Sequence, residues 1–144
     1  LFRSLDTIER DAGAILGRAV RLPSVRGRSV TWLRLVRLRA PGASGAQVLL
    51  RIGPRMAADF ASIFILRDED RFTVFDAFGR PLPMPEGEVF SVAVHGDLPD
   101  SVIHLFRVGA YVYGVESSDR AVADELVAEL QSIEASSEPD EPAR

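Results

Sequence analysis

The sequence contains no cysteine and no lysine, and only two of its 144 residues are histidine. Without cysteine, the chain has no disulfide, no thiolate nucleophile and no cysteine-based zinc site. Without lysine, it cannot form the usual phosphate loop, whose lysine contacts the nucleotide phosphates. A Gly-x-Ser-x-Gly elbow and a Gly-x-Gly-x-x-Gly loop after a strand are also missing. We therefore expect a protein that is not an enzyme, with no catalytic residue and no cofactor.

Long apolar runs are missing as well. No stretch approaches the roughly 18 uncharged residues of a membrane span, and no secretory signal pattern opens the chain. We expect a cytoplasmic protein without a membrane partner. Because the sequence begins with Leu1 rather than methionine, it stays open whether an N-terminal segment has been removed.

The two histidines carry the only hint of a metal site. His95 and Asp97 form a His-x-Asp pair, whereas a metal site needs three or four converging ligands. His104 lies in an apolar strand pattern, which is typical of a hydrogen-bonded core residue. We assign no metal ligand, and whether His95 and Asp97 bind a metal stays open.

The composition is that of one globular domain. Apolar residues make up 47% of the chain, and a chain of this length can bury a sizeable core. We expect a single domain over residues 1–133. Residues 134–144 are rich in serine, glutamate and proline, which is typical of a flexible acidic tail.

Two stretches show the spacing of an amphipathic helix. The first predicts a helix over residues 3–16, with Ser4 as a possible N-cap and Gly17 as its C-terminal end. The second predicts a helix from about Asp119, with Ser117 or Ser118 at its start. The apolar positions of the second helix are Val122, Leu126, Leu130 and Ile133.

The rest of the chain is mostly β-rich. Residues 102–108 and 111–116 read as two strands joined through Gly109-Ala110 in a tight hairpin. A second hairpin is expected over residues 29–53, and residues 54–62 favour a short helical turn before a strand. We therefore predict an α+β fold, with a mainly antiparallel sheet of about six or seven strands and the N- and C-terminal helices packed on one face.

The charge is distributed unevenly. All 17 basic residues are arginine, which reflects a bacterial-type composition of the source genome more than a site. Residues 1–60 hold eleven arginines against four acids, a balance of +7. Residues 61–144 hold six arginines against seventeen acids, a balance of −11. This asymmetry favours either pairing between the two parts within one fold, or contact with an anionic partner or a second copy.

The arginine-rich segment 21–39 is the main candidate for partner binding. Its candidate residues are Arg28, Trp32, Arg34, Arg37 and Arg39. Period-two alternation places Trp32 and Arg34 on one face of a strand, and Arg37 and Arg39 on the other. Arginines around an exposed tryptophan would suit a nucleic acid, although the acidic pI of about 5.2 argues against this.

Three functions remain open. The first is a non-enzymatic protein-interaction or regulatory module, adaptor- or chaperone-like, with a homodimer as one form of it. The second is a small-ligand sensor with an aromatic cavity between sheet and helix. Its aromatic residues would be Phe72, Phe90, Phe106, Tyr111 and Tyr113. The third is nucleic-acid binding through the arginine-rich segment 21–39.

Overall fold

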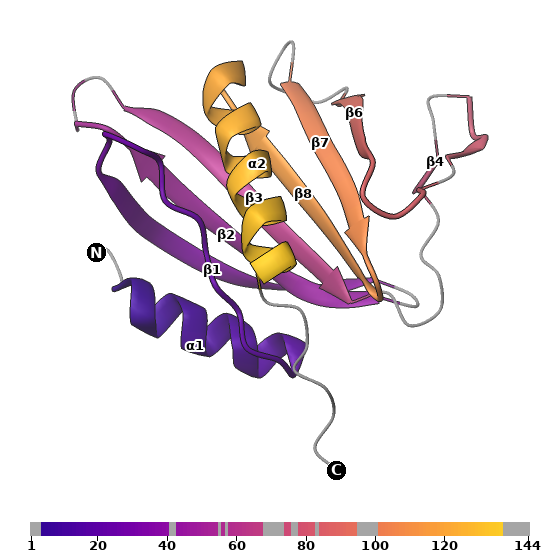
Figure 1. Cartoon of the computed structure of the whole chain (residues 1–144), viewed down its shortest axis with the longest axis horizontal. Helices are drawn as coiled ribbons and strands as arrows, with labels where there is room; N and C mark the ends of the chain where they lie inside the picture. Colours follow the sequence, from indigo (N-terminus) through magenta and orange to yellow (C-terminus); the bar gives the residue numbers. More distant parts are fainter. Residues whose placement is uncertain are drawn as a thin grey trace.

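The computed structural model of the chain describes residues 4–40, 43–54, 56, 58–67, 74–75, 78–82, 84–94 and 101–136. Its elements are α1 (Leu5–Leu16), β1 (Val30–Ala40), β2 (Ala43–Ile52), β3 (Asp59–Arg67), β4 (Val74–Phe75), β5 (Pro81–Leu82), β6 (Val89–Val94), β7 (Ser101–Val108), β8 (Tyr111–Ser117) and α2 (Arg120–Ser136). Six strands form one sheet in the order β1-β2-β3-β8-β7-β6, and β4 and β5 form a separate two-stranded ladder (Figure 1). Every strand pair is antiparallel. This confirms the predicted α+β fold.

Both helices cover the same face of the sheet. Figure 1 shows α2 lying across the middle of the sheet, while α1 lies along β1. Alternate residues of β2, such as Val48 and Leu50, are fully buried against the helices. They join Ile8 of α1 and Leu126 of α2 in one apolar core. The core therefore lies between the sheet and the two helices, and the apolar stripe of each helix is used for this packing.

Helix α1 begins at Leu5 rather than at residue 3, and it ends at Leu16 as predicted. The Ser4 side chain accepts a hydrogen bond from the Thr7 N–H at 3.2 Å, which satisfies one of the free donors of the first turn. Gly17 closes the helix with a φ of 73°, in the left-handed region that glycine adopts at little cost. Both predicted caps are confirmed.

Helix α2 has a different cap from the predicted one. The Asp119 carboxylate accepts a hydrogen bond from the Ala121 N–H at 2.9 Å. The prediction of Ser117 or Ser118 as the cap was wrong, because Ser117 still belongs to β8 and donates its hydroxyl to the Phe60 carbonyl. The helix continues to Ser136, past the predicted end of the domain at residue 133. The rest of the predicted tail, residues 137–144, lies outside the described residues.

The two predicted hairpins are both present. Val108 and Tyr111 pair across the two-residue turn between β7 and β8, and Gly109 has the expected positive φ of 57°. The other hairpin joins β1 and β2. Its alternation differs from the prediction, because the register shifts between Trp32 and Arg34. This bulge places Trp32 on the same face as Arg37, and Arg34 on the opposite face.

The helical turn predicted within residues 54–62 does not extend over residues 59–62. The strand already begins at Asp59 and pairs along its whole length with β2. Met56 lies in a turn, and residues 55 and 57 are outside the described residues. The local helix preference of this stretch is weak, and strand pairing with burial of Ala61 and Ile63 outweighs it.

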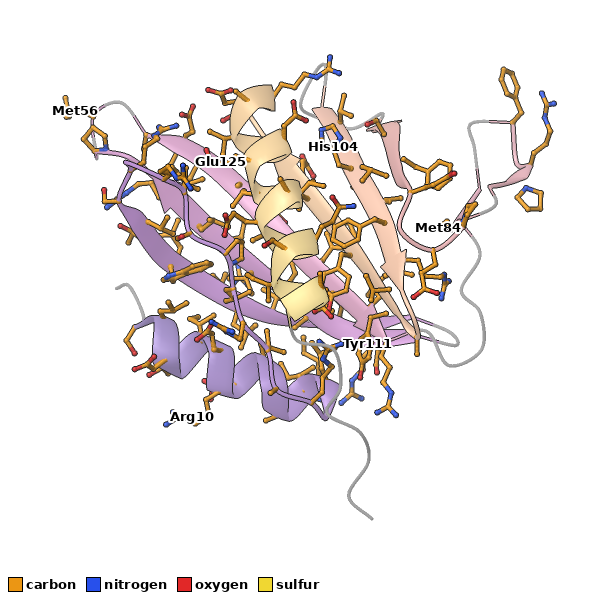
Figure 2. All side chains as sticks on the ribbon, viewed as in Figure 1. Arg10, Met56, Met84, His104, Tyr111 and Glu125 are labelled. Carbon is orange, nitrogen blue, oxygen red and sulfur yellow. The ribbon has the colours of Figure 1, made fainter. Side chains whose placement is uncertain are left out.

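Residues 18–29, which we call the strap, connect α1 to β1 and run between the two helices (Figure 1). The Leu22 N–H donates to the Glu9 carboxylate of α1 at 2.6 Å. The Arg26 N–H donates to Glu125 of α2 at 3.0 Å, and Figure 2 shows Glu125 on the side of α2 that faces the strap. Val20, Leu22 and Val25 are buried. The strap thereby closes the helical layer over the sheet.

Candidate functional site

An open groove lies at the C-terminal end of α2. It has a volume of about 870 Å³ and is bounded by α2, the start of the strap and the turn between β7 and β8. Its apolar wall includes Phe106, Val108, Tyr111 and Ile133. Figure 2 shows Tyr111 below the end of α2, where these segments meet. The size is within the range of sites for small organic ligands.

The polar side of the groove is a network of three residues. Nη2 of Arg18 donates to both carboxylate oxygens of Glu134, at 2.8 and 3.1 Å. The hydroxyl of Tyr113 donates to the same carboxylate. The side chains of Arg18 and Glu134 are only 28% and 12% exposed, so the ion pair is largely withdrawn from water. The network therefore attaches the end of α2 to the strap and to β8.

Burial and this network set the charges of the three groups. Burial, together with the hydrogen bond to Glu134, raises the pKa of Tyr113 above its ordinary value. Burial by itself would lower the pKa of Arg18, but the hydrogen bond to Glu134 and the electrostatic interactions with Tyr113, Glu134 and Tyr111 together outweigh it, so the pKa is raised. At neutral pH the phenol therefore keeps its proton and the guanidinium keeps its charge. Neither group is prepared for proton transfer.

Aromatic contacts complete this end of the core. The rings of Phe106 and Tyr113 stack with centroids 5.0 Å apart and planes 8° apart. The Arg18 guanidinium lies 4.5 Å from the centre of the Tyr111 ring, which is a cation–π contact. The structure thus brings together three of the five aromatic residues proposed for a sensor cavity. Phe90 lies on the opposite face of the sheet, since it pairs with Leu105, and Phe72 is outside the described residues.

The candidate residues of the arginine-rich segment do not form one surface. Trp32 is only 5% exposed and belongs to the core, so it offers no ring for stacking on a base. Arg28 is paired with Asp59 at 2.7 Å and also donates to the Ile52 carbonyl. Arg34, Arg37 and Arg39 are exposed, but the bulge places Arg34 on the opposite face of the sheet from the other two.

The histidines give no metal site among the residues that the structure describes. His104 is buried, and its Nδ1 shares a hydrogen bond of 2.8 Å with the Ser91 hydroxyl. His95 and Asp97 lie outside the described part of the chain. Within that part, no three His, Asp or Glu side chains gather closely enough to hold a metal ion.

The second candidate surface is the face of the six-stranded sheet opposite the helices, which we call the open face. Within the described ranges, no helix lies on it. Its side chains are Arg34, Val36 and Leu38 of β1, Gln47, Leu49 and Arg51 of β2, Phe60, Ser62, Phe64 and Leu66 of β3, Val112 and Glu116 of β8, Ile103, Leu105 and Arg107 of β7, and Phe90 of β6. Most of these residues are apolar, and Phe60 is 55% exposed.

Two glycines make the open face flat near its centre. The ring of Phe64 lies directly over Gly114, at the place that a Cβ atom would occupy. A Cβ atom at Gly45 would lie 2.9 Å from Leu66 Cδ2 and still closer to the Ile65 carbonyl oxygen. Both large side chains come from β3 and lie down across its two neighbouring strands. A flat, mostly apolar sheet surface is the kind that a second sheet covers in a β-sandwich.

Sequence reasoning did not identify the open face or the role of Glu134. Phe64 and Gly114 are 50 positions apart, and only the pairing of β3 with β8 brings them together. The alternation of β3 does indicate two apolar faces, since Ile63 and Phe64 point in opposite directions. This alternation predicts that both faces of the sheet are covered at β3, but it does not show which face the helices cover.

The chain matches no protein-family model, and no curated protein or solved structure is significantly similar to it. Among the described residues, the helices are too short or too polar to cross a membrane. The two surfaces therefore have to be interpreted from their own geometry and chemistry.

Proposed function

We propose that this chain is a non-enzymatic protein-interaction module, adaptor- or chaperone-like, that binds a protein partner on its open face. One observation carries the proposal: a six-stranded sheet has helices on one face, while mostly apolar side chains occupy the other face. A sheet face of this kind gains free energy when another layer covers it.

The two amphipathic helices offer little free apolar surface to a partner. Their apolar stripes are already buried, with Ile8, Leu16, Leu126 and Leu130 at most 1% exposed. At the groove, Arg18 and Glu134 are paired with each other, and the Glu86 carboxylate accepts a hydrogen bond from the Gly109 N–H. On the open face, Phe60 is 55% exposed and Phe64 and Leu66 are partly exposed, although Val112 and Leu105 are buried there.

Photocrosslinking tests the proposal directly. The photoreactive residue p-benzoylphenylalanine replaces Phe60 on the open face and, as a matched control, the exposed Ala128 on α2. We expect protein adducts from position 60 and none from position 128, in cells or extracts of the native source. A second change, Leu49→Asp, places a charge beside position 60 and should remove the adducts. The proposal fails if position 60 yields no protein adduct, whether to another protein or to a second copy.

The groove supports a second candidate function, a small-ligand sensor. Its volume of about 870 Å³ and its aromatic wall of Phe106 and Tyr111 favour this reading. Ala135 is exposed and lines the groove on α2, so Ala135→Trp should fill it without disturbing the core. A small molecule that raises the melting temperature of the wild type, but not of Ala135→Trp, would establish the sensor. A panel that shifts neither protein would count against it.

A further inference from the structure

We infer that a second copy of this chain covers the open face, in a two-fold dimer whose axis runs parallel to the strands between β2 and β3. The inference rests on the proposed function and names the partner. In such a dimer, β2 of one copy lies over β3 of the other, and β1 lies over β8. Register partners on neighbouring strands form a row of side chains across the sheet, and the rotation keeps each row at the same position along the strands.

The strand register supplies the first reason. Arg34 of β1, Leu49 of β2, Ser62 of β3 and Glu116 of β8 form one row across the open face. The two-fold rotation exchanges the two ends of this row. Arg34 of each copy therefore faces Glu116 of the other, and the dimer contains this pair of opposite charges twice.

The neighbouring rows are complementary in the same arrangement. Arg51 of β2 pairs in register with Phe60 of β3, so the rotation places the Arg51 guanidinium over Phe60 of the second copy. Phe60 is the most exposed described ring of the six-stranded sheet, at 55%. The Arg51 guanidinium donates through Nη2 to the Thr31 hydroxyl at 3.4 Å. A cation–π contact with Phe60 of the second copy would give the remaining surface of this guanidinium a partner.

The third row brings apolar groups together. Gly45 of β2 and Leu66 of β3 are register partners, and the Leu66 side chain of the same chain already fills the space beside Gly45. The rotation therefore places the Leu66 side chains of the two copies close to the axis, where each covers apolar surface of the other.

Other arrangements lack this complementarity. A two-fold axis perpendicular to the strands would place β1 over β1 and β8 over β8. Arg34 would then face only the side chains of β1, and Glu116 only those of β8, so these opposite charges would not meet. An acidic peptide from another protein would suit Arg34 and Arg51, but it would meet repulsion from Glu116.

The area is also adequate for a dimer. Four strands about 4.8 Å apart, with nine residues at about 3.4 Å each as in β3, give a planar footprint of roughly 600 Å² per copy. Side-chain relief raises the accessible area above this planar figure, towards the roughly 800 Å² per partner of a standard interface.

Charge reversal tests the inference, with analytical ultracentrifugation over a concentration series as the readout. We expect the wild type to form a dimer. Its dissociation constant should rise at least about tenfold in Arg34→Glu and in Glu116→Arg, because each variant creates two pairs of like charges across the interface. The double variant Arg34→Glu/Glu116→Arg restores the opposite charges and should return to the wild-type value. Arg37→Glu is the matched control, since Arg37 is exposed on the same strand but on the helix side.

Replacing Glu116 also removes contacts within its own chain. A third variant therefore separates loss of the dimer from loss of folding. Phe60→Arg changes an exposed residue and would set it against Arg51 of the second copy, so it should also weaken the dimer while the melting temperature of the monomer is kept. A monomeric wild type overturns the inference, and so does a dimer that all these variants leave unchanged. In either case, adducts of position 60 with a different protein would leave the proposed function standing.

Discussion

Replacement of Glu134 by alanine is the sharpest test of how this fold is held together. The sequence places residue 134 in a flexible acidic tail, where its loss would cost nothing. The structure places its carboxylate between Arg18 and the Tyr113 hydroxyl, at the junction of α2, the strap and β8. The two interpretations predict different stabilities for the same variant.

The size of the effect follows from the contacts that are lost. A hydrogen bond to a charged group contributes about 1.5–3 kcal/mol, and the 28% exposure of the Arg18 side chain places this one near the lower end. The Tyr113 hydroxyl loses its acceptor, and a buried unsatisfied hydroxyl costs about 1–3 kcal/mol. We expect Glu134→Ala to lower the free energy of unfolding by about 2–4 kcal/mol. For a chain of this size, the melting temperature should fall by about 6–12 °C.

Thermal unfolding followed by circular dichroism, with a urea titration, measures the effect. Glu129→Ala is the matched control, since Glu129 lies on the same helix and no hydrogen bond or ion pair of its side chain is described. Glu134→Gln should lose less than alanine, because an amide oxygen still accepts from Tyr113. In the double variant Arg18→Ala/Glu134→Ala, the two losses should not add, because they break the same pair. If Glu134→Ala melts within about 1 °C of Glu129→Ala, the anchoring of α2 is refuted.

Three further predictions follow from the same structure. The raised pKa of Tyr113 means that the unfolded chain loses the phenol proton first, so stability is fully present below about pH 10 and falls above it by at most about 1.4 kcal/mol per pH unit. Alkaline unfolding curves should show this loss in the wild type and less of it in Tyr113→Phe. Gly114→Ala would place a Cβ atom inside the Phe64 ring and should cost about 1–3 kcal/mol by urea unfolding, whereas the added loss should be smaller in a Phe64→Ala background. Asp119→Ala should cost about 1 kcal/mol by removing the cap of α2. Ser118→Ala, which loses only the long hydrogen bond of 3.4 Å that its hydroxyl accepts from the Phe60 N–H, should cost clearly less; equal losses would show that the cap is misassigned.

The arginine-rich segment shows how far local patterns carry a functional interpretation. The charge asymmetry favoured pairing between the two parts of the chain or an outside partner, and Arg18–Glu134 is one pair of the first kind. Nucleic-acid binding through residues 21–39 stays a prediction. It predicts an affinity for nucleic acid that falls steeply with salt and is lost when Arg34, Arg37 and Arg39 are replaced. The burial of Trp32 removes the stacking aromatic on which that prediction relied.

Local signals were sufficient wherever a residue acts on its immediate neighbours. Ser4 and Gly17 delimit α1, and Gly109 forms the turn between β7 and β8, because capping and turn geometry depend on a few adjacent residues. The period of the apolar residues determined the helices and most of the strands, and with them the α+β class. By itself, the sequence thus determined most of the elements of this protein and two of its hairpins, while the order of the strands in the sheet came only from the structure.

Only the tertiary structure decided which surfaces remain in contact with solvent. Strand pairing overrode the weak helix preference at residues 59–62, and one bulge placed Trp32 and Arg34 on opposite faces of the sheet. Glu134 became an anchor because the strap brings Arg18 to the end of α2, across 116 positions of sequence. The helices could have covered either apolar face of β3, and the choice depends on packing summed over the whole core rather than on any single segment. That choice leaves the open face, where the proposed function lies.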